Sequence, residues 1–163
     1  MKHIVTAGMF FVLTAGAAFA QPAGAPAAST GPTGVWRVED GTADIRIVDC
    51  GGSYWGVTVW SKDTSGDDKD KNNPNPALRN RSLTNAAILS NFTAANDAWQ
   101  GQVYNPLDGR TRDVQLSLVS NDVLKIEGCM GGLCFGIGAQ EWARQPMPKG
   151  APADKAVCAK MAK

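Results

Sequence analysis

The chain has 163 residues and carries 16 basic against 15 acidic side chains, for a net charge of +1. This balance excludes the strongly basic surface with which proteins bind nucleic acid or an anionic membrane. Its 18 glycines and 9 prolines are spread along the chain, and such a composition favours many turns and therefore β structure.

Residues 1–20 have the pattern of a secretory signal peptide. A basic start at Lys2 and His3 precedes a mostly apolar stretch, and Ala18-Phe19-Ala20 forms an A-x-A cleavage site. We therefore expect cleavage after Ala20 and a periplasmic or secreted mature protein that has no membrane span. Residues 21–32 are rich in proline and alanine and lack large apolar groups, which predicts a disordered leader.

The chain from residue 33 to residue 145 predicts a series of short strands. Apolar and polar residues alternate over segments that are separated by Gly, Asn and Asp, which is typical of antiparallel strands. The predicted strands are 35–40, 43–50, 54–61, 87–92, 99–104, 110–119, 123–130 and 133–144. Eight antiparallel strands in sequence order close most simply as an up-and-down barrel. We expect one all-β domain at 33–145, followed by a C-terminal tail at 146–163.

A barrel of eight strands either fills its interior with side chains or holds one small ligand. The alternation within four strands predicts an inward set that would line a ligand cavity. This set is Trp55, Val57, Val59, Trp99, Val103, Leu116, Leu124 and Ile126. Filling of the core is the alternative role for the same side chains. Tyr54 and Trp60 fall on the other face of the third strand, where we expect them at the surface.

Four cysteines in an exported chain predict two disulfides. Cys129 and Cys134 flank Met-Gly-Gly-Leu, which has the composition of a two-residue type I′ hairpin. They would then face each other in a non-hydrogen-bonded pair, with Cα atoms about 4.5 Å apart, within reach of a disulfide. The remaining pair is Cys50 with Cys158. A zinc site is disfavoured, because the cysteines lack histidine partners and a C-x-x-C spacing.

Histidine is almost absent from the sequence. The only one is His3, inside the predicted signal peptide, so the mature chain lacks an imidazole base and any Ser-His or Cys-His pair. Most carboxylates fall on predicted outward faces, where solvated surface is their usual role. We expect no catalytic site and no cofactor.

Residues 62–77 predict a long polar loop without apolar periodicity. Asp68, Asp70 and Asn72 have the spacing that opens a calcium loop. The sixth position is asparagine and not glycine, and the twelfth is arginine and not glutamate. We therefore expect no metal there and a loop exposed to solvent.

An ordered set of short motifs over about residues 33–145 resembles the DUF2147 family of small exported bacterial proteins. The motifs are Gly34-x-Trp36, Cys50-Gly51-Gly52, Gly56-x-x-x-Trp60, Asp70-x-x-Asn73-Pro74, Leu78-Arg79-x-Arg81, Trp99-x-Gly101, Tyr104-Asn105-Pro106, Leu124-x-Ile126-x-Gly128-Cys129 and Trp142-x-Arg144. The resemblance implies a lipocalin-like (calycin) barrel in which Trp36 of the first strand packs under Arg144 of the last. It implies no enzyme activity.

The resemblance also bears on one disulfide. Related chains tend to read Leu-Cys-Gly where this chain has Tyr54-Trp55-Gly56, so a local bridge from Cys50 is not available here. This departure supports the pairing of Cys50 with Cys158.

Two functions follow as expectations. The first is an exported, non-enzymatic binding protein that carries a small apolar or amphipathic ligand in its barrel. The alternative is a periplasmic protein-interaction or inhibitor module with a filled barrel. A cavity of a few hundred Å³ would favour the first, and a packed interior would favour the second.

Overall fold

The computed structural model describes residues 31–62 and 68–161, so the predicted signal peptide and nearly all of the leader lie outside the described residues. The eight strands are β1 (Gly34–Arg37), β2 (Ala43–Asp49), β3 (Tyr54–Ser61), β4 (Ala87–Ala95), β5 (Ala98–Asn105), β6 (Arg110–Ser120), β7 (Val123–Met130) and β8 (Leu133–Gln145). A short 3₁₀ helix, η1 (Pro76–Leu78), lies between β3 and β4, and one α-helix, α1 (Asp154–Met161), follows β8.

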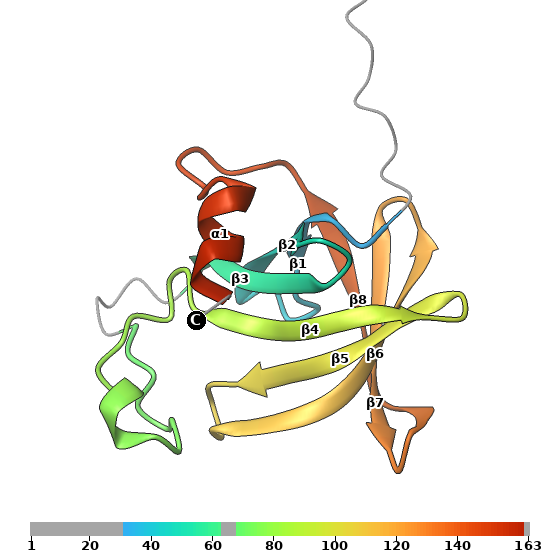
Figure 1. Ribbon diagram of the computed structural model, residues 1–163, viewed down its shortest axis with the longest axis horizontal. Coiled ribbons are helices and arrows are strands. Elements are labelled where there is room, and N and C mark those ends of the chain that lie inside the picture. The colour runs from blue at the N-terminus through green and yellow to red at the C-terminus, as the bar shows by residue number, and fades with distance from the viewer. Residues whose placement is uncertain (1–30, 63–67, 162–163) are drawn as a thin grey trace, which may run out of the picture.

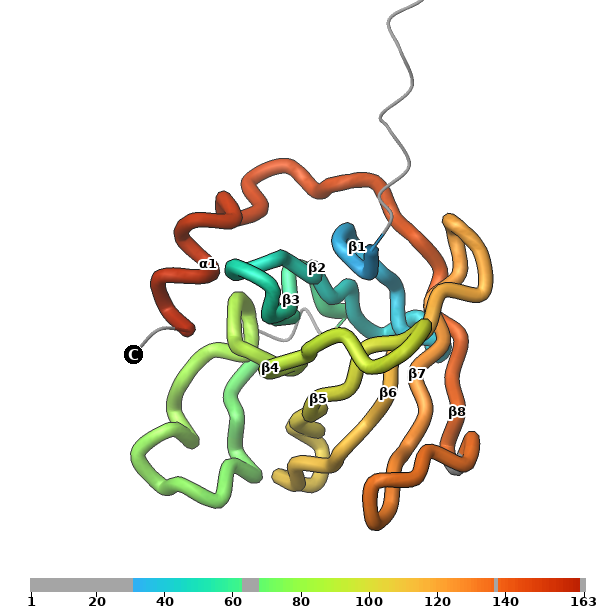
Figure 2. Tube along the Cα trace, turned by 45° about the vertical axis from the view of Figure 1, so that its right-hand side comes forward, coloured from blue at the N-terminus to red at the C-terminus, as the bar shows by residue number. Residues whose placement is uncertain are grey.

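The eight strands form one closed barrel (Figures 1 and 2). Each strand pairs antiparallel with the next, and β8 returns to pair with β1, with Trp36 opposite Arg144. The prediction of an all-β, eight-stranded, antiparallel up-and-down barrel is confirmed. Among the described residues, no helix has the length and apolar character to cross a membrane.

The up-and-down order gives the barrel two different ends. The turns after β2, β4 and β6 lie at one end, which also holds Arg144 at the end of β8; we call it the Arg144 end. The connections after β1, β3, β5 and β7 lie at the other end, which we call the loop end. The longest connection, between β3 and β4, contains η1 and therefore belongs to the loop end.

Large apolar side chains fill the middle of the barrel. Those that solvent does not reach at all, at 0% exposed, are Trp36, Leu89, Phe92, Leu116 and Leu124. A fully buried side chain borders no cavity that a water molecule could enter, so the middle of the barrel is packed. Gly101 permits part of this packing, because a Cβ there would lie 2.6 Å from the Phe92 ring.

The helix α1 packs on the outer side of the barrel, against β2 and β3. Val157 of the helix is buried with Val48 of β2 and Val57 of β3 in a second apolar cluster. A disulfide between Cys50 and Cys158, with Cα atoms 5.4 Å apart, ties the helix to the end of β2 as predicted. The C-terminal tail is therefore part of the folded domain.

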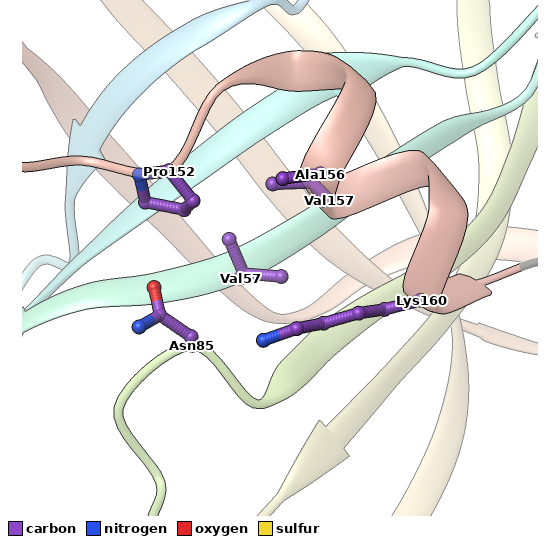
Figure 3. A pocket seen from close by; sticks show the side chains of 6 residues that line it. All are labelled: Val57, Asn85, Pro152, Ala156, Val157 and Lys160. Atoms are coloured by element: carbon purple, nitrogen blue, oxygen red, sulfur yellow. The ribbon is translucent and has the colours of Figure 1, made fainter.

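The inward direction predicted for the third strand is wrong. Trp55, Val57 and Val59 belong to the outer cluster beneath α1, and Figure 3 shows Val57 beside Val157 of the helix. Because α1 covers β3 from outside, apolar residues occur on both of its faces and alternation does not identify the inner one. Tyr54, expected at the surface, instead packs against the interior cluster.

Trp60 does lie on the outer surface, as predicted, and is 39% exposed. The Arg37 guanidinium stands 4.8 Å from the centre of its ring. Arg37 also forms two hydrogen bonds with Asp44, of 2.8 and 2.9 Å, which hold it in place. The exposed ring is therefore part of an ordered surface cluster.

Candidate functional site

The Cys129–Cys134 disulfide forms at the tip of the β7–β8 hairpin, as predicted. Met130 pairs with Leu133, and the two cysteines form the next pair, with Cα atoms 4.0 Å apart. The two turn residues between them, both glycine, have φ of 61° and 82°, which the type I′ turn requires and other residues adopt at a cost. The disulfide makes this hairpin, which we call the stapled hairpin, a rigid edge of the loop end.

The predicted ligand-lining set divides in the structure. Trp99, Val103, Leu116, Leu124 and Ile126 all belong to or pack against the interior cluster, whereas the three residues of β3 do not. Leu116 and Leu124 are fully buried and Ile126 is 6% exposed. Of these five, only Trp99 and Val103 are half-buried. These five therefore form a packed floor, and the predicted set does not enclose one cavity.

The interior is more accessible toward its two ends than in its middle. At the loop end Val38, Ala43 and Val103 pack against the core while remaining half-buried, as Tyr54, Trp99 and Leu118 do toward the Arg144 end. Gln140, paired with Ile126, is exposed, and its side-chain oxygen accepts a 3.0 Å hydrogen bond from Trp142 Nε1. We call Val38, Ala43, Val103, Ile126 and Gln140 the mouth of the barrel.

Exposed apolar side chains lie at the same end of the barrel as the mouth. Met130, Leu133 and Phe135 of the stapled hairpin are 69%, 61% and 59% exposed, and Leu107 of the β5–β6 turn is 83% exposed. Large apolar groups that gather at one end of a soluble domain are typical of a contact surface. We call these four residues of the loop end the apolar rim.

The Arg144 end is closed, and the contact between Trp36 and Arg144 that the family resemblance implied is present there. The guanidinium carbon of Arg144 lies 4.0 Å from the centre of the Trp36 ring. Arg144 Nη1 donates to the Thr33 carbonyl at 3.0 Å, and Trp36 Nε1 donates to the Pro32 carbonyl at 2.8 Å. Residues that precede β1 are thereby held across this end, so a ligand of the barrel would enter at the loop end.

A buried carboxylate organises the long β3–β4 connection. Asp70 is 0% exposed and accepts hydrogen bonds from Tyr104 Oη at 2.5 Å, Asn73 Nδ2 at 2.7 Å and Arg81 Nε at 2.9 Å. The expectation of a solvated loop is therefore wrong at this residue. Its most distant partner in sequence, Tyr104, comes from β5, so the pattern of the loop alone could not reveal the network.

The pKa values in this network follow from its contacts. Burial by itself would raise the pKa of Asp70, but the hydrogen bonds from Tyr104, Asn73 and Arg81 outweigh burial and lower it. Burial and the hydrogen bond to Asp70 raise the pKa of Tyr104 to about 12. Asp70 is therefore a carboxylate and Tyr104 a neutral phenol at neutral pH.

The same connection is anchored to the β5–β6 turn. Asn72 Nδ2 donates to the carbonyls of Pro106 and Leu107 at 3.1 and 2.9 Å. Asp68, the first residue of the calcium-like spacing, accepts hydrogen bonds from Ser82 and Thr84. Within the described part of the chain, no three His, Cys, Asp or Glu side chains are grouped so that they could hold a metal ion. The polar residues of the connection thus position it beside the mouth.

Comparisons with known proteins agree with this architecture. The model of the DUF2147 family, described as an uncharacterized protein conserved in bacteria, matches residues 34–144. Among solved structures, the chain is similar to protein HP1028 from the human pathogen Helicobacter pylori, described as belonging to the lipocalin family. The two are 25% identical with a TM-score of 0.62, over 70% of this chain and 82% of that one. No curated protein matches the chain. The protein is a member of the DUF2147 family with a lipocalin-like barrel.

Proposed function

We propose that this protein is an exported, non-enzymatic binding protein that holds a small apolar or amphipathic molecule at the mouth of its barrel. The observation that carries the proposal is that only one end of the packed barrel is left uncovered. Half-buried apolar side chains occur toward both ends, but Arg144 and the residues before β1 cover the Arg144 end, which leaves Val38, Ala43 and Val103 of the loop end for a ligand. The lipocalin-family neighbour supports a binding role by analogy of fold.

The mouth offers two kinds of contact. The half-buried Val103 and the buried Ile126 beneath the opening are the apolar side chains against which a chain or ring would be desolvated. The Gln140 carboxamide next to them has donor positions for a polar head group. This combination suits an amphipathic molecule whose apolar part enters first.

The absence of an enzymatic role is proposed from the chemistry of the side chains. The only histidine of the sequence is His3, within the predicted signal peptide. Asp70, the most deeply buried carboxylate described, is occupied by three donors from the protein and therefore is poorly suited to accept a proton from a substrate. Export is supported by the two disulfides, which persist in oxidising compartments.

The test is titration of the protein with palmitate and with an environment-sensitive apolar dye. We expect saturable binding to the parent protein. Val103→Trp should raise the Kd at least tenfold, because the indole would fill the mouth. Overpacking of this kind costs about 1–3 kcal/mol, which thermal denaturation will detect. Val119→Trp is the matched control, because Val119 is 58% exposed and lies near the Arg144 end. No saturable binding, or equal Kd values for the two variants, would refute the proposal.

The packed middle of the barrel favours a second candidate, a protein-interaction module. Its contact surface would be the rim formed by Met130, Leu133 and Phe135. Phe135→Ser should then prevent capture of a partner from periplasmic extract while palmitate binding stays unchanged. If ligand binding is lost and partner capture is not, the first candidate holds.

A further inference from the structure

A polar groove lies on the outer wall of the barrel, separate from the mouth. Its volume is about 430 Å³, and its floor is formed by β4, β5 and β6. The polar side chains that line it are those of Asn91, Thr93, Gln100, Gln102 and Asp113. Gln100 and Gln102 alternate along β5 with Trp99 and Val103 of the interior cluster, so they face away from the barrel axis.

The stapled hairpin forms one side of this groove. Cys129 and Gly132 line it, and Cys134 Sγ lies 3.8 Å from Gln100 Nε2. The hairpin belongs to β7 and β8, yet it reaches a residue of β5. The Cys129–Cys134 disulfide therefore holds a wall over the polar face of the sheet.

The polar side chains follow the register of the sheet. Thr93 pairs with Gln100, Gln100 with Gln115, and Gln115 with Glu127, which makes a row across β4 to β7. Gln102 and Asp113 form the next pair along the strands. Neighbouring strands lie about 4.8 Å apart, and alternate residues of one strand about 6.8 Å apart, so the groups form a regular grid.

Hydrogen bonds among these side chains fix their orientation. Gln100 Nε2 donates to Gln115 Oε1, and Gln115 Nε2 donates to Glu127 Oε1, each at 3.1 Å. Gln102 Nε2 donates to Asp113 Oδ1, also at 3.1 Å. Among the described residues no donor reaches the carboxamide oxygens of Gln100 or Gln102, so these acceptors are available to a ligand. Side chains that are already ordered lose less entropy when they bind.

The chemistry of the lining limits the class of ligand. No lysine or arginine lines the groove, which disfavours phosphates and other anions. Asp113 is the only carboxylate of the lining and it already accepts a bond from Gln102, which disfavours cations. Carboxamides and a hydroxyl offer donors and acceptors side by side, as hydroxyl groups of a ligand require. The open and polar wall does not suit a lipid chain.

We propose that this groove is a binding site for a neutral polyhydroxylated molecule, an oligosaccharide, which lies along β5 between Thr93 and the Cys129–Cys134 hairpin. The Gln100 and Gln102 carboxamides contact its hydroxyl groups, and Asp113 accepts one further hydrogen bond. The disulfide acts as a positioning element, because it holds the hairpin wall in place.

The test uses neutral disaccharides, maltose and N,N′-diacetylchitobiose, with the parent protein by saturation-transfer NMR and calorimetry. Spermidine and glucose 6-phosphate serve as cationic and anionic probes. We expect at least one disaccharide to bind and both charged probes to fail. Gln102→Ala should weaken disaccharide binding at least tenfold, and Gln145→Ala is the matched control outside the groove. Thr93→Trp, which fills the groove from an exposed position, should abolish binding even if Gln102→Ala proves unstable.

The result is independent of the proposal for the mouth. Val103→Trp should leave disaccharide binding unchanged, and Thr93→Trp should leave palmitate binding unchanged. The double variant Cys129→Ser/Cys134→Ser should weaken disaccharide binding while the barrel remains folded. Absence of disaccharide binding, stronger binding of a charged probe, or binding that survives Thr93→Trp would overturn the assignment.

Discussion

Arg144 lies over Trp36 at the point where the barrel closes, with its guanidinium carbon 4.0 Å from the centre of the indole. The two residues are direct partners in the register between β8 and β1. Arg144 also donates to backbone carbonyls of Thr33 and Asn121, which belong to segments on either side of the junction. One side chain thus links the first strand, the last strand and the β6–β7 turn.

Arg144→Ala should destabilise the barrel. The substitution removes a cation–π contact of about 0.5–2 kcal/mol together with the hydrogen bonds to the Thr33 and Asn121 carbonyls. We expect a loss of about 2–4 kcal/mol and a fall in Tm of about 5–10 °C by calorimetry. Arg110→Ala, at an exposed position of β6, is the control and should change Tm little. Equal Tm values for the two variants would contradict the role of Arg144 in closure.

The two disulfides should differ in their contribution to stability. Cys50–Cys158 closes a loop of 108 residues and Cys129–Cys134 one of 5. Loop-closure entropy then predicts losses of about 5 and about 2 kcal/mol when each pair is replaced by serine. Guanidinium denaturation of the two double variants measures this difference. Peptide mapping without reductant should find these pairs, and a Cys50–Cys129 link would contradict the pairing.

Asp70→Ala should loosen the β3–β4 connection. The change leaves Arg81 and Tyr104 without their buried partner, and removal of one member of a buried charged pair costs about 3–5 kcal/mol. We expect a lower free energy of unfolding and faster hydrogen exchange over residues 68–86. Asp97→Ala, at an exposed turn, is the control. Unchanged exchange in this segment would show that the network does not hold it.

The Asp70–Tyr104 pair should also limit stability at both extremes of pH. The pKa of Asp70 is lowered by folding, so its contribution is complete above its ordinary pKa of 3.8 and is lost as the pH falls through the folded value. The pKa of Tyr104 is raised, so its contribution is complete below 10.0 and is lost as the pH rises toward about 12. Urea denaturation across this range measures the loss of stability at acid and at alkaline pH. Tyr104→Phe should remove the alkaline loss. If the stability of this variant still falls at alkaline pH, other groups and not Tyr104 cause the fall.

Local patterns determined the features that depend on neighbouring residues in the chain. Alternation placed Leu116, Leu124 and Ile126 in the interior, because the outer faces of β6 and β7 are polar. The Gly-Gly turn brought Cys129 and Cys134 together within a few residues. Counting eight antiparallel strands was sufficient to predict a closed barrel, and the family resemblance implied the meeting of Trp36 with Arg144.

Tertiary contacts decided the rest. The direction of Val57 depends on α1, a hundred residues further along the chain, which turns the outer face of β3 into a second core. The burial of Asp70 depends on Tyr104 of β5, and the outer groove depends on a hairpin that reaches across two strands to Gln100. In each case a side chain of ordinary local pattern is covered by an element distant in sequence. Periodicity records which residues alternate, whereas burial depends on what the folded chain places on each face.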